Sequence, residues 1–278
     1  MKKQLGFWGV IARLLMWGAL LTLVLIVLYP LIWMVIGSFK TNYEFLNDPF
    51  GFPQVMNWGN YGEAWERGIG RYLLNSIIVT IVSVVTTTLI SAWAAFGLTK
   101  LVVPFGNVLL FLIVGGLMLA PTVALIPLLK ILQALGINDT LFALIILYTA
   151  FRIPFTTFLI RSYMVDLPVE VDEAAVLDGC SPSQTFWRVT LPMSKPILIS
   201  SVILQVLFAW NEYLFAFIFI SDEATKTLPV GLADLSSRLT TDYPMVLAGM
   251  TMAALPMIIL FFAGQRFFIQ GLADGVGK

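Results

Sequence analysis

Residues 14–37 read LLMWGALLTLVLIVLYPLIWMVIG, a run that contains no Asp, Glu, Lys or Arg. About 20 apolar residues in a helix are enough to cross the ~30 Å hydrocarbon layer of a membrane. Runs of this kind recur along the chain and predict six spans, at 14–37, 73–98, 107–129, 141–161, 197–220 and 245–265. Lipid offers the backbone no hydrogen-bond partners, and the alternation typical of barrel strands is missing, so we expect these spans to be helices.

The composition supports the same class. The chain has 278 residues, of which 59% are hydrophobic and 12% charged, and its mean hydropathy is +0.92. These values lie far outside those of soluble domains. We therefore predict an all-α polytopic membrane protein with a single transmembrane domain that covers residues 1–278.

Several function classes are excluded by the same residues. The 16 basic and 16 acidic residues cancel, whereas a nucleic-acid partner calls for a basic surface. There is no His, and Cys180 is the only cysteine. Metal sites built on His and Cys, and a disulfide within the chain, are therefore excluded.

The orientation follows from the Lys and Arg residues, which gather on the cytoplasmic side of membrane proteins. Nine of the 16 fall on the side of the two termini, six fall on the other side, and Arg152 lies within a span. This excess predicts that both termini are cytoplasmic. The Met1-Lys2-Lys3 start resembles that of a signal peptide, but the first apolar run lacks a cleavage site, so we expect it to remain as an anchor.

A long polar interruption, residues 162–195, separates the fourth and fifth spans. From Asp166 to Pro192 it reads DLPVEVDEAAVLDGCSPSQTFWRVTLP. Acidic residues near its start and a glycine at 179 predict one short helix. Ser181 and Gln184 form a capping-box pattern around Pro182, which predicts a second.

This two-helix segment has the character of a docking element. Phe186 and Val189 fall three apart, which predicts an apolar ridge suited to a groove on another protein. The alternative is an amphipathic pair lying on the bilayer. Residues 162–187 contain no Lys or Arg, however, and are a poor match for an anionic lipid surface.

The residues of this segment resemble a known family. Glu173-Ala174-Ala175-x-x-Asp178-Gly179 is followed by Phe186, Val189, Leu191-Pro192 and Pro196, and the whole run resembles the "EAA" loop of bacterial ABC-importer permeases. Cys180 departs from it, since alanine is commonest there. Other pieces resemble the carbohydrate branch with its maltose-transporter MalG-like subunits, namely Ser38-Phe39-Lys40, Trp58-x-Asn60-Tyr61, Asn75-Ser76, Trp210-Asn211-Glu212, Thr227–Leu232 and Arg266-x-Phe268-x-x-Gly271-Leu272.

The resemblance implies a complex in the bacterial cytoplasmic membrane. Its other members would be a dimer of ATPase subunits, a second permease and an extracytoplasmic solute-binding protein, and the segment 221–244 would face that protein. The chain has no G-x-x-x-x-G-K-[ST] phosphate loop, so ATP and Mg²⁺ would be bound by the partner ATPase, and we expect neither a cofactor nor catalytic residues in this chain.

The resemblance also assigns roles within the loop, with simple helix capping as the alternative at each position. Glu173 would contact the ATPase, Ala174 and Ala175 would allow close packing, Asp178 would pair or cap locally, and Gly179 would form the turn between the two coupling helices.

Ionisable residues inside spans are costly in lipid and mark candidate sites. Arg152 lies in the fourth span, and Glu212 follows Asn211 in the fifth. They form either an intramembrane ion pair, which we favour, or part of a solute path. Pro121 and Pro127 are expected to kink the third span.

Sugars or oligosaccharides are the solutes that the resemblance implies. A polyol, glycerol phosphate or another small solute is the alternative within the same family. An ion-driven secondary transporter, or a membrane scaffold that transports nothing, are the rival classes. A secondary transporter predicts inverted repeats, which the sequence does not show.

Overall fold

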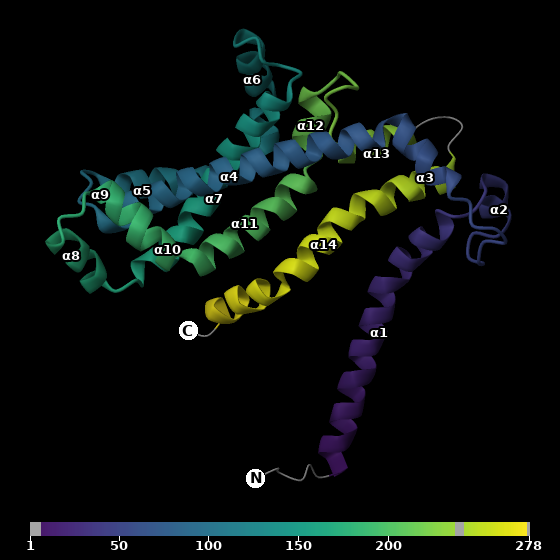
Figure 1. Ribbon diagram of the computed structural model, residues 1–278, viewed down its shortest axis with the longest axis horizontal. Coiled ribbons are helices and arrows are strands. Elements are labelled where there is room, and N and C mark those ends of the chain that lie inside the picture. Colours follow the sequence, from purple (N-terminus) through teal and green to yellow (C-terminus); the bar gives the residue numbers. More distant parts are fainter. Residues whose placement is uncertain (1–6, 237–241, 277–278) are drawn as a thin grey trace. The chain divides into compact units, whose positions relative to one another are not determined.

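The computed structural model describes residues 7–236 and 242–276, with side chains described at 13–236 and 242–265. Throughout these ranges the regular elements are helices, so the predicted all-α class is confirmed (Figure 1). The Met1-Lys2-Lys3 start lies outside the described residues, and so do the side chains of the Arg266–Leu272 motif. The chain divides into two compact units, Met1–Ile69 with Asp234–Leu255 and Gly70–Ala233 with Pro256–Lys278.

The first unit holds the elements α1 (Phe7–Gly37), α2 (Asn42–Asn47), α3 (Gly59–Ala64), η1 (Trp65–Ile69) and the start of α14 (Tyr243–Val276). From Arg13 to Ile32 every side chain of α1 is exposed, as expected of a helix whose partners are lipid or another subunit. After α1 the chain folds compactly, because the Asn60 amide donates to the carbonyl oxygens of Ser38 and Lys40 at 2.7 and 2.8 Å. The Ser38-Phe39-Lys40 and Trp58-x-Asn60-Tyr61 motifs are therefore in direct contact.

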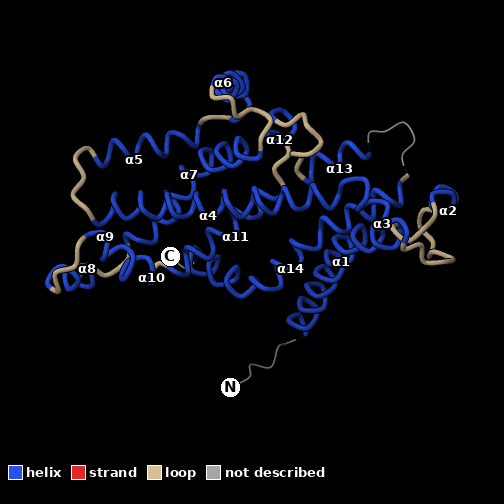
Figure 2. The backbone as a smooth tube through the Cα atoms, turned by 45° about the horizontal axis from the view of Figure 1, so that its top comes forward, coloured by secondary structure: helices blue, strands red, loops and turns tan. Residues whose placement is uncertain are grey.

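The second unit holds the remaining helices. They are α4 (Gly70–Lys100), α5 (Gly106–Gly115), η2 (Gly116–Met118), α6 (Pro121–Ala134), α7 (Leu141–Val165), α8 (Val169–Leu177), α9 (Pro182–Thr185), η3 (Phe186–Thr190), α10 (Leu191–Met193), α11 (Lys195–Trp210), α12 (Leu214–Phe219), most of α13 (Leu228–Ser236) and the rest of α14. In this unit α4 packs along α7 and α11, and α5 lies beside α7 (Figure 2).

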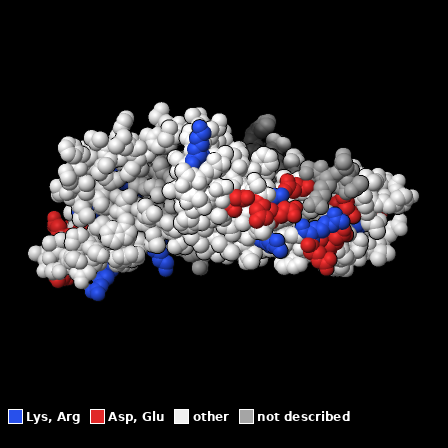
Figure 3. All heavy atoms as spheres, turned by 90° about the horizontal axis from the view of Figure 1, so that it is seen from above, with Lys and Arg blue, Asp and Glu red and all other residues white. Residues whose placement is uncertain are grey.

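Among the residues that the structure describes, four helical ranges are long and apolar enough to cross a membrane. They are Arg13–Gly37, Gly59–Lys100, Leu141–Val165 and Tyr243–Gln265. Two bent pairs raise the number to as many as six, Gly106–Met118 with Pro121–Ala134 at 101°, and Pro182–Met193 with Lys195–Trp210 at 78°. On the face drawn in Figure 3, Lys, Arg, Asp and Glu gather mainly in one cluster toward the right, and most of the rest of the surface is formed by uncharged residues.

Two predicted spans are interrupted. In the predicted span 107–129 the chain turns sharply at Leu119 and Ala120, because Pro121 begins a new helix instead of continuing the old one. In the predicted span 197–220, α11 ends at Trp210 and α12 begins at Leu214. Backbone groups freed inside a membrane need new partners, and both interruptions border the cavity described below.

Close packing of α4 on α7 follows from small side chains on α4. The face of α4 that is buried carries mainly small polar or small apolar residues, namely Ser76, Val79, Thr80, Ser83, Val84, Thr87, Thr88, Ser91, Ala92 and Ala95. Small residues let helix backbones approach closely where lipid supplies no hydrophobic driving force. Near the C-terminal end of α4, Phe96 packs in a buried cluster with Ile160, Met164 and Phe186.

Candidate functional site

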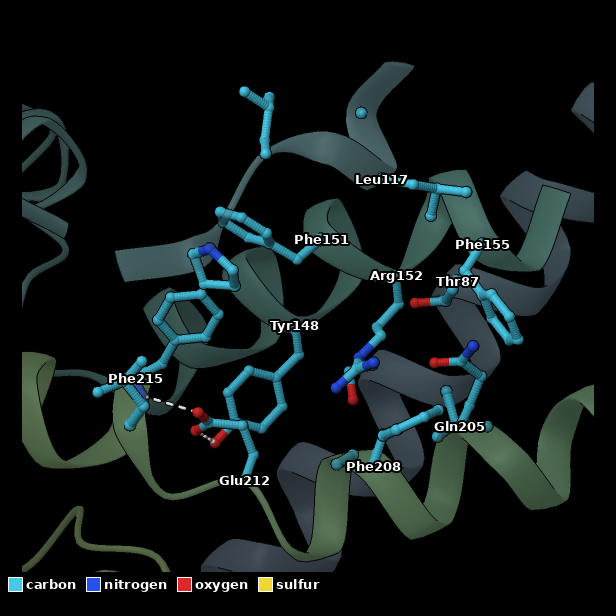
Figure 4. A pocket seen from close by; sticks show the side chains of 17 residues that line it. Thr87, Leu117, Tyr148, Phe151, Arg152, Phe155, Gln205, Phe208, Glu212 and Phe215 are labelled. Carbon is cyan, nitrogen blue, oxygen red and sulfur yellow. Dashed lines mark hydrogen bonds between the residues drawn. The ribbon is translucent and has the colours of Figure 1, made fainter. Parts of the chain in front are cut away.

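A cavity of about 310 Å³ lies inside the second unit, between α4, α7, α11 and the two chain interruptions. Its wall is mostly apolar and aromatic, with a few polar groups that converge on it (Figure 4). The polar side chains are those of Ser83, Thr87, Tyr148, Arg152, Gln205 and Glu212. An apolar wall with a small number of placed polar groups is typical of a small-molecule site.

Glu212 occupies the interruption between α11 and α12. Its carboxylate accepts hydrogen bonds from the backbone N–H groups of Phe215, at 2.8 Å, and Ala216, at 3.2 Å. The Tyr148 hydroxyl donates to the same carboxylate at 2.6 Å. A carboxylate at a helix N-terminus satisfies otherwise unpaired N–H groups and the helix dipole. Glu212 therefore caps the N-terminus of α12 and is hydrogen-bonded to α7 at the same time.

Arg152 faces the same cavity from α7. Its guanidinium carbon lies 3.9 Å from the centroid of the Phe208 ring, a cation–π contact. Within the described part of the chain the Arg152 guanidinium makes no hydrogen bond or ion pair, so its donors are available to a ligand (Figure 4). Arginine carries five such donors in a planar fork.

The structure thus brings Arg152 and Glu212 to one cavity, but not into the ion pair that we favoured from the sequence. The described ion pairs are elsewhere, at Arg67–Glu63 and Lys100–Asp172. In the structure the Glu212 oxygens accept hydrogen bonds from the α12 backbone and from Tyr148, whereas the Arg152 guanidinium lies over the Phe208 ring. Asn211 is exposed, donates to the Leu207 carbonyl at 2.7 Å and does not line the cavity.

The polar segment 162–195 forms α8, α9, η3 and α10 next to the C-terminal end of α4 (Figures 1 and 2). The predicted capping box is present, since Gln184 N–H donates to Ser181 Oγ at 3.3 Å and Ser181 N–H donates to Gln184 Oε1 at 2.8 Å. Gly179 has φ +77°, a left-handed conformation that favours glycine, at the turn between the two short helices.

The loop differs from the expected apolar ridge at Phe186. Its side chain is completely buried and packs inward, with ring centroids 4.5 Å from Trp93 and 5.4 Å from Phe96 on α4. The two most exposed apolar side chains of the loop are instead Val176 and Leu177, at 67% and 88% exposed. Sequence spacing placed Phe186 on a helix face but could not say that α4 covers this face.

The other predicted coupling residues divide between the two sides of the loop. Glu173, Ala174, Asp178 and Pro192 are exposed, and Leu191 is half-buried against the cluster around Phe186. Ala175 is buried, with 5% of its surface exposed, so of the two alanines only Ala175 is close-packed within this chain.

Comparison with known proteins decides the family. Residues 87–271 match the family described as "Binding-protein-dependent transport system inner membrane component". The chain belongs to this family. The match covers the whole loop and most of the cavity wall, including Tyr148, Arg152 and Glu212.

Relatives of this inner membrane component match along nearly their full lengths. The ABC transporter permease protein YurM of Bacillus subtilis is 45% identical over 262 residues, which cover 94% of this chain and 87% of that protein. The trehalose/maltose transport system permease protein MalG of Thermococcus litoralis is 32% identical, over 95% of this chain and 96% of that protein.

A solved structure has the same fold. A chain from a bacterial ABC transporter involved in the import of alginate superposes with a TM-score of 0.83 at 23% identity, covering 96% of this chain and 99% of the other. This likeness supports the helical architecture of the inner membrane component described above.

Three cavity residues of this inner membrane component escaped the sequence reasoning. Tyr148 precedes Arg152 by four residues, a spacing that places both on one face of α7 and could have linked them. Gln205 is buried, and its amide donates to Thr156 Oγ1 at 2.5 Å. Phe208 resembled any other apolar residue of the span, because only the tertiary structure sets it under Arg152.

Proposed function

We propose that this chain is the membrane-spanning permease subunit of an ATP-driven importer that takes up oligosaccharides or other sugars. The family match over residues 87–271 is the observation that carries this proposal. The names of relatives support a sugar as the solute, since those proteins include permeases for trehalose/maltose, melibiose/raffinose/stachyose and arabinooligosaccharides.

The proposed complex contains a second permease, a dimer of ATPase subunits and a solute-binding protein outside the membrane. A structural relative, with a TM-score of 0.65, comes from an alginate transporter solved with an alginate pentasaccharide-bound periplasmic protein. ATP and Mg²⁺ belong to the ATPase partner, and the chain itself is not an enzyme. Both termini would lie in the cytoplasm of a bacterium.

The exposed side of the loop 162–195 would dock on the ATPase. Leu177, the most exposed apolar residue of α8, would enter an apolar groove, and Glu173 beside it would meet a basic residue. Gly179 would hold the bend between α8 and α9, because its left-handed conformation strains other residues. Closure of the ATPases would then move the loop as a unit.

The cavity would contact the solute on its path. Arg152 offers unpaired donors, and the Phe208, Phe151 and Phe155 rings offer apolar faces for the C–H side of a sugar ring. Arg152 and Glu212 carry opposite charges, which favours a neutral, hydroxyl-rich ligand over an anion. A solute such as glycerol phosphate would instead need the Arg152 charge without a carboxylate nearby.

Reconstitution of the whole transporter tests the proposal. The complex is purified through a tag on this chain, placed in vesicles with the solute-binding protein of the same gene cluster, and given radiolabelled maltose, raffinose, diacetylchitobiose or glycerol phosphate. We expect an ATPase to co-purify and at least one neutral sugar to accumulate only with ATP. Uptake driven by an ion gradient without ATP would refute the importer, and accumulation of glycerol phosphate alone would refute the sugar.

Substitutions in the cavity test its part separately. Arg152→Lys keeps the charge but loses the planar fork, and Phe208→Leu removes the aromatic face. With the accumulated sugar we expect the half-saturation concentration to rise about ten-fold for Arg152→Lys, as for loss of a charged hydrogen bond. Asn211→Ala, outside the cavity, is the matched control. Equal effects of all three would show that the cavity does not bind solute.

A further inference from the structure

Helix α4 is long and continuous. It runs for 31 residues, Gly70–Lys100, and contains no proline. At 1.5 Å per residue it is about 45 Å long, the thickness of a bilayer with its headgroup layers. By contrast, α7 contains Pro154, the pair α5–α6 is bent by 101° and α11 stops at Trp210. A continuous helix is a rigid element, so a displacement of one end is transmitted to the other end.

The C-terminal end of α4 is bonded to the loop by an ion pair. Lys100 Nζ lies 2.7 Å from Asp172 Oδ2 on α8, and it also donates to the Leu167 carbonyl at 3.2 Å. The two side chains are only 8% and 21% exposed. Shielding from solvent strengthens such a pair relative to the surface ion pairs that contribute little. A cation in the last turn also suits the helix dipole of α4.

The aromatic side chain of Phe186 holds the second half of the loop to the same end of α4. Phe186 begins η3 and is buried against Trp93 and Phe96, both in the last two turns of α4. The Lys100–Asp172 pair and Phe186 are together called the inner contact. Through it both short helices of the loop, before and after Gly179, are fixed to one helix.

The N-terminal part of α4 makes a second set of specific bonds, to the segment 224–228 between α12 and α13. The Asn75 amide donates to the carbonyl oxygens of Ala224 and Lys226, both at 2.9 Å. The Leu228 N–H donates to Ser76 Oγ at 2.8 Å. These bonds, called the outer contact, bring the Asn75-Ser76 motif against the start of the Thr227–Leu232 motif.

Close packing of backbone on a ring completes the outer contact. A Cβ atom added to Gly231 would lie 2.1 Å from Cδ2 of Tyr72, which is on the first turn of α4. Only glycine lets α13 approach this closely. The segment 224–231 is thus held on α4 by the Asn75 amide, the Ser76 hydroxyl and close packing against the Tyr72 ring.

We propose that α4 is the element that links the two faces of the permease. Lys100 and Asp172 are the positioning residues that transmit movement of the ATPase-side loop to the helix. Asn75 and Ser76 are the positioning residues that transmit it from the helix to the segment 224–228. The proposal rests on the proposed function, since it presumes that the loop docks on an ATPase. It assigns the transmission to one helix and to four named side chains.

The experiment uses the full transporter in vesicles and three readouts, which are co-purification of the ATPase, basal ATP hydrolysis, and hydrolysis stimulated by the solute-binding protein. Lys100→Met and Asp172→Asn remove the ion pair from either side. Lys100→Arg keeps it. Lys130→Met, an exposed lysine on α6, and Glu170→Gln, an exposed acid on α8, are the matched controls.

Stimulated hydrolysis is expected to fall about ten-fold in Lys100→Met and in Asp172→Asn, a typical size for coupling between distant sites. Co-purification of the ATPase stays as in the unaltered complex, Lys100→Arg restores most of the stimulation, and the two controls match the unaltered complex. Asn75→Ala, at the other end of α4, lowers the stimulation as well. Combined with Asp172→Asn it causes little further loss, because both substitutions interrupt one connection.

Stimulation that is unchanged in Lys100→Met and Asp172→Asn would overturn the proposal. Losses that multiply in the Asn75→Ala/Asp172→Asn double variant would also overturn it, because the two ends of α4 would then act separately. Failure of the unaltered chain to bring down any ATPase would overturn the proposed function itself, a different result from either of these. Should Lys100→Met fail to assemble, Asp172→Asn retains a hydrogen-bond acceptor for Lys100 and still gives the answer.

Discussion

Replacement of Phe186 by alanine separates the two roles that this residue could have in the loop. If Phe186 anchors the loop to α4, the substitution destabilises the permease, whereas a side chain that docks on a partner would leave the isolated chain intact. The side chain is completely buried, and three aromatic rings lie near it, those of Trp93, Trp187 and Phe96 at 4.5, 5.0 and 5.4 Å between centroids.

The magnitude follows from this burial. Truncation of a buried Phe to Ala typically costs about 3–5 kcal/mol, of which aromatic pairs contribute about 0.5–1.5 kcal/mol each. Trp187 is 47% exposed and can collapse partly into the space. We therefore expect a loss near the lower end, about 3 kcal/mol. Phe186→Leu, which conserves more volume, should cost less than about 1.5 kcal/mol.

The assay is reversible unfolding of the purified chain in mixed detergent, with co-purification of the ATPase measured in parallel. Leu177→Ala is the matched comparison, because Leu177 is 88% exposed. It should change the free energy of unfolding by less than about 0.5 kcal/mol, yet weaken ATPase co-purification. The reasoning is refuted if Phe186→Ala has the same free energy of unfolding as the unaltered chain while the ATPase no longer co-purifies with it.

Three further substitutions are predicted from local geometry. Gly179→Asp forces a non-glycine residue to φ +77°, and we expect uptake to be abolished while the chain still appears in the membrane fraction; normal ATP-dependent uptake would contradict this. Gly231→Ala places a methyl group 2.1 Å from Tyr72 and should lower the free energy of unfolding by about 1–3 kcal/mol, which a second substitution, Tyr72→Leu, partly restores. Glu212→Ala removes the cap of α12 and the acceptor of Tyr148, for a loss of about 2 kcal/mol. It should not rescue Arg152→Ala, and rescue would show that the two residues pair.

The loop shows how far local sequence rules reach. The capping box at Ser181 and Gln184 and the turn at Gly179 were predicted because each depends on residues a few positions apart. The Lys100–Asp172 pair was not, since nothing along the chain relates two residues separated by the whole of α5, α6 and α7 and their loops. The direction of Phe186 was missed for the same reason.

The intramembrane site shows a second limit. Charge inside a span drew attention to Arg152 and Glu212, and both line the cavity. The partners of these two side chains could not be predicted from the sequence. The fifth span is interrupted at residues 211–213, and the Glu212 carboxylate accepts hydrogen bonds from the backbone N–H groups that this interruption leaves free. A hydropathy pattern measures apolar length, and it does not register where a helix stops and begins again.

The sequence by itself therefore determined that this chain is helical, lies in a membrane and belongs with the binding-protein-dependent permeases. Apolar length and the unmet hydrogen bonds of a backbone in lipid leave few other structures, and the loop motif is local. Only the tertiary structure decided which side chains act together. Arg152 lies over Phe208, Glu212 caps α12, and α4 contacts two segments far apart in the chain, because these relations arise from packing between helices.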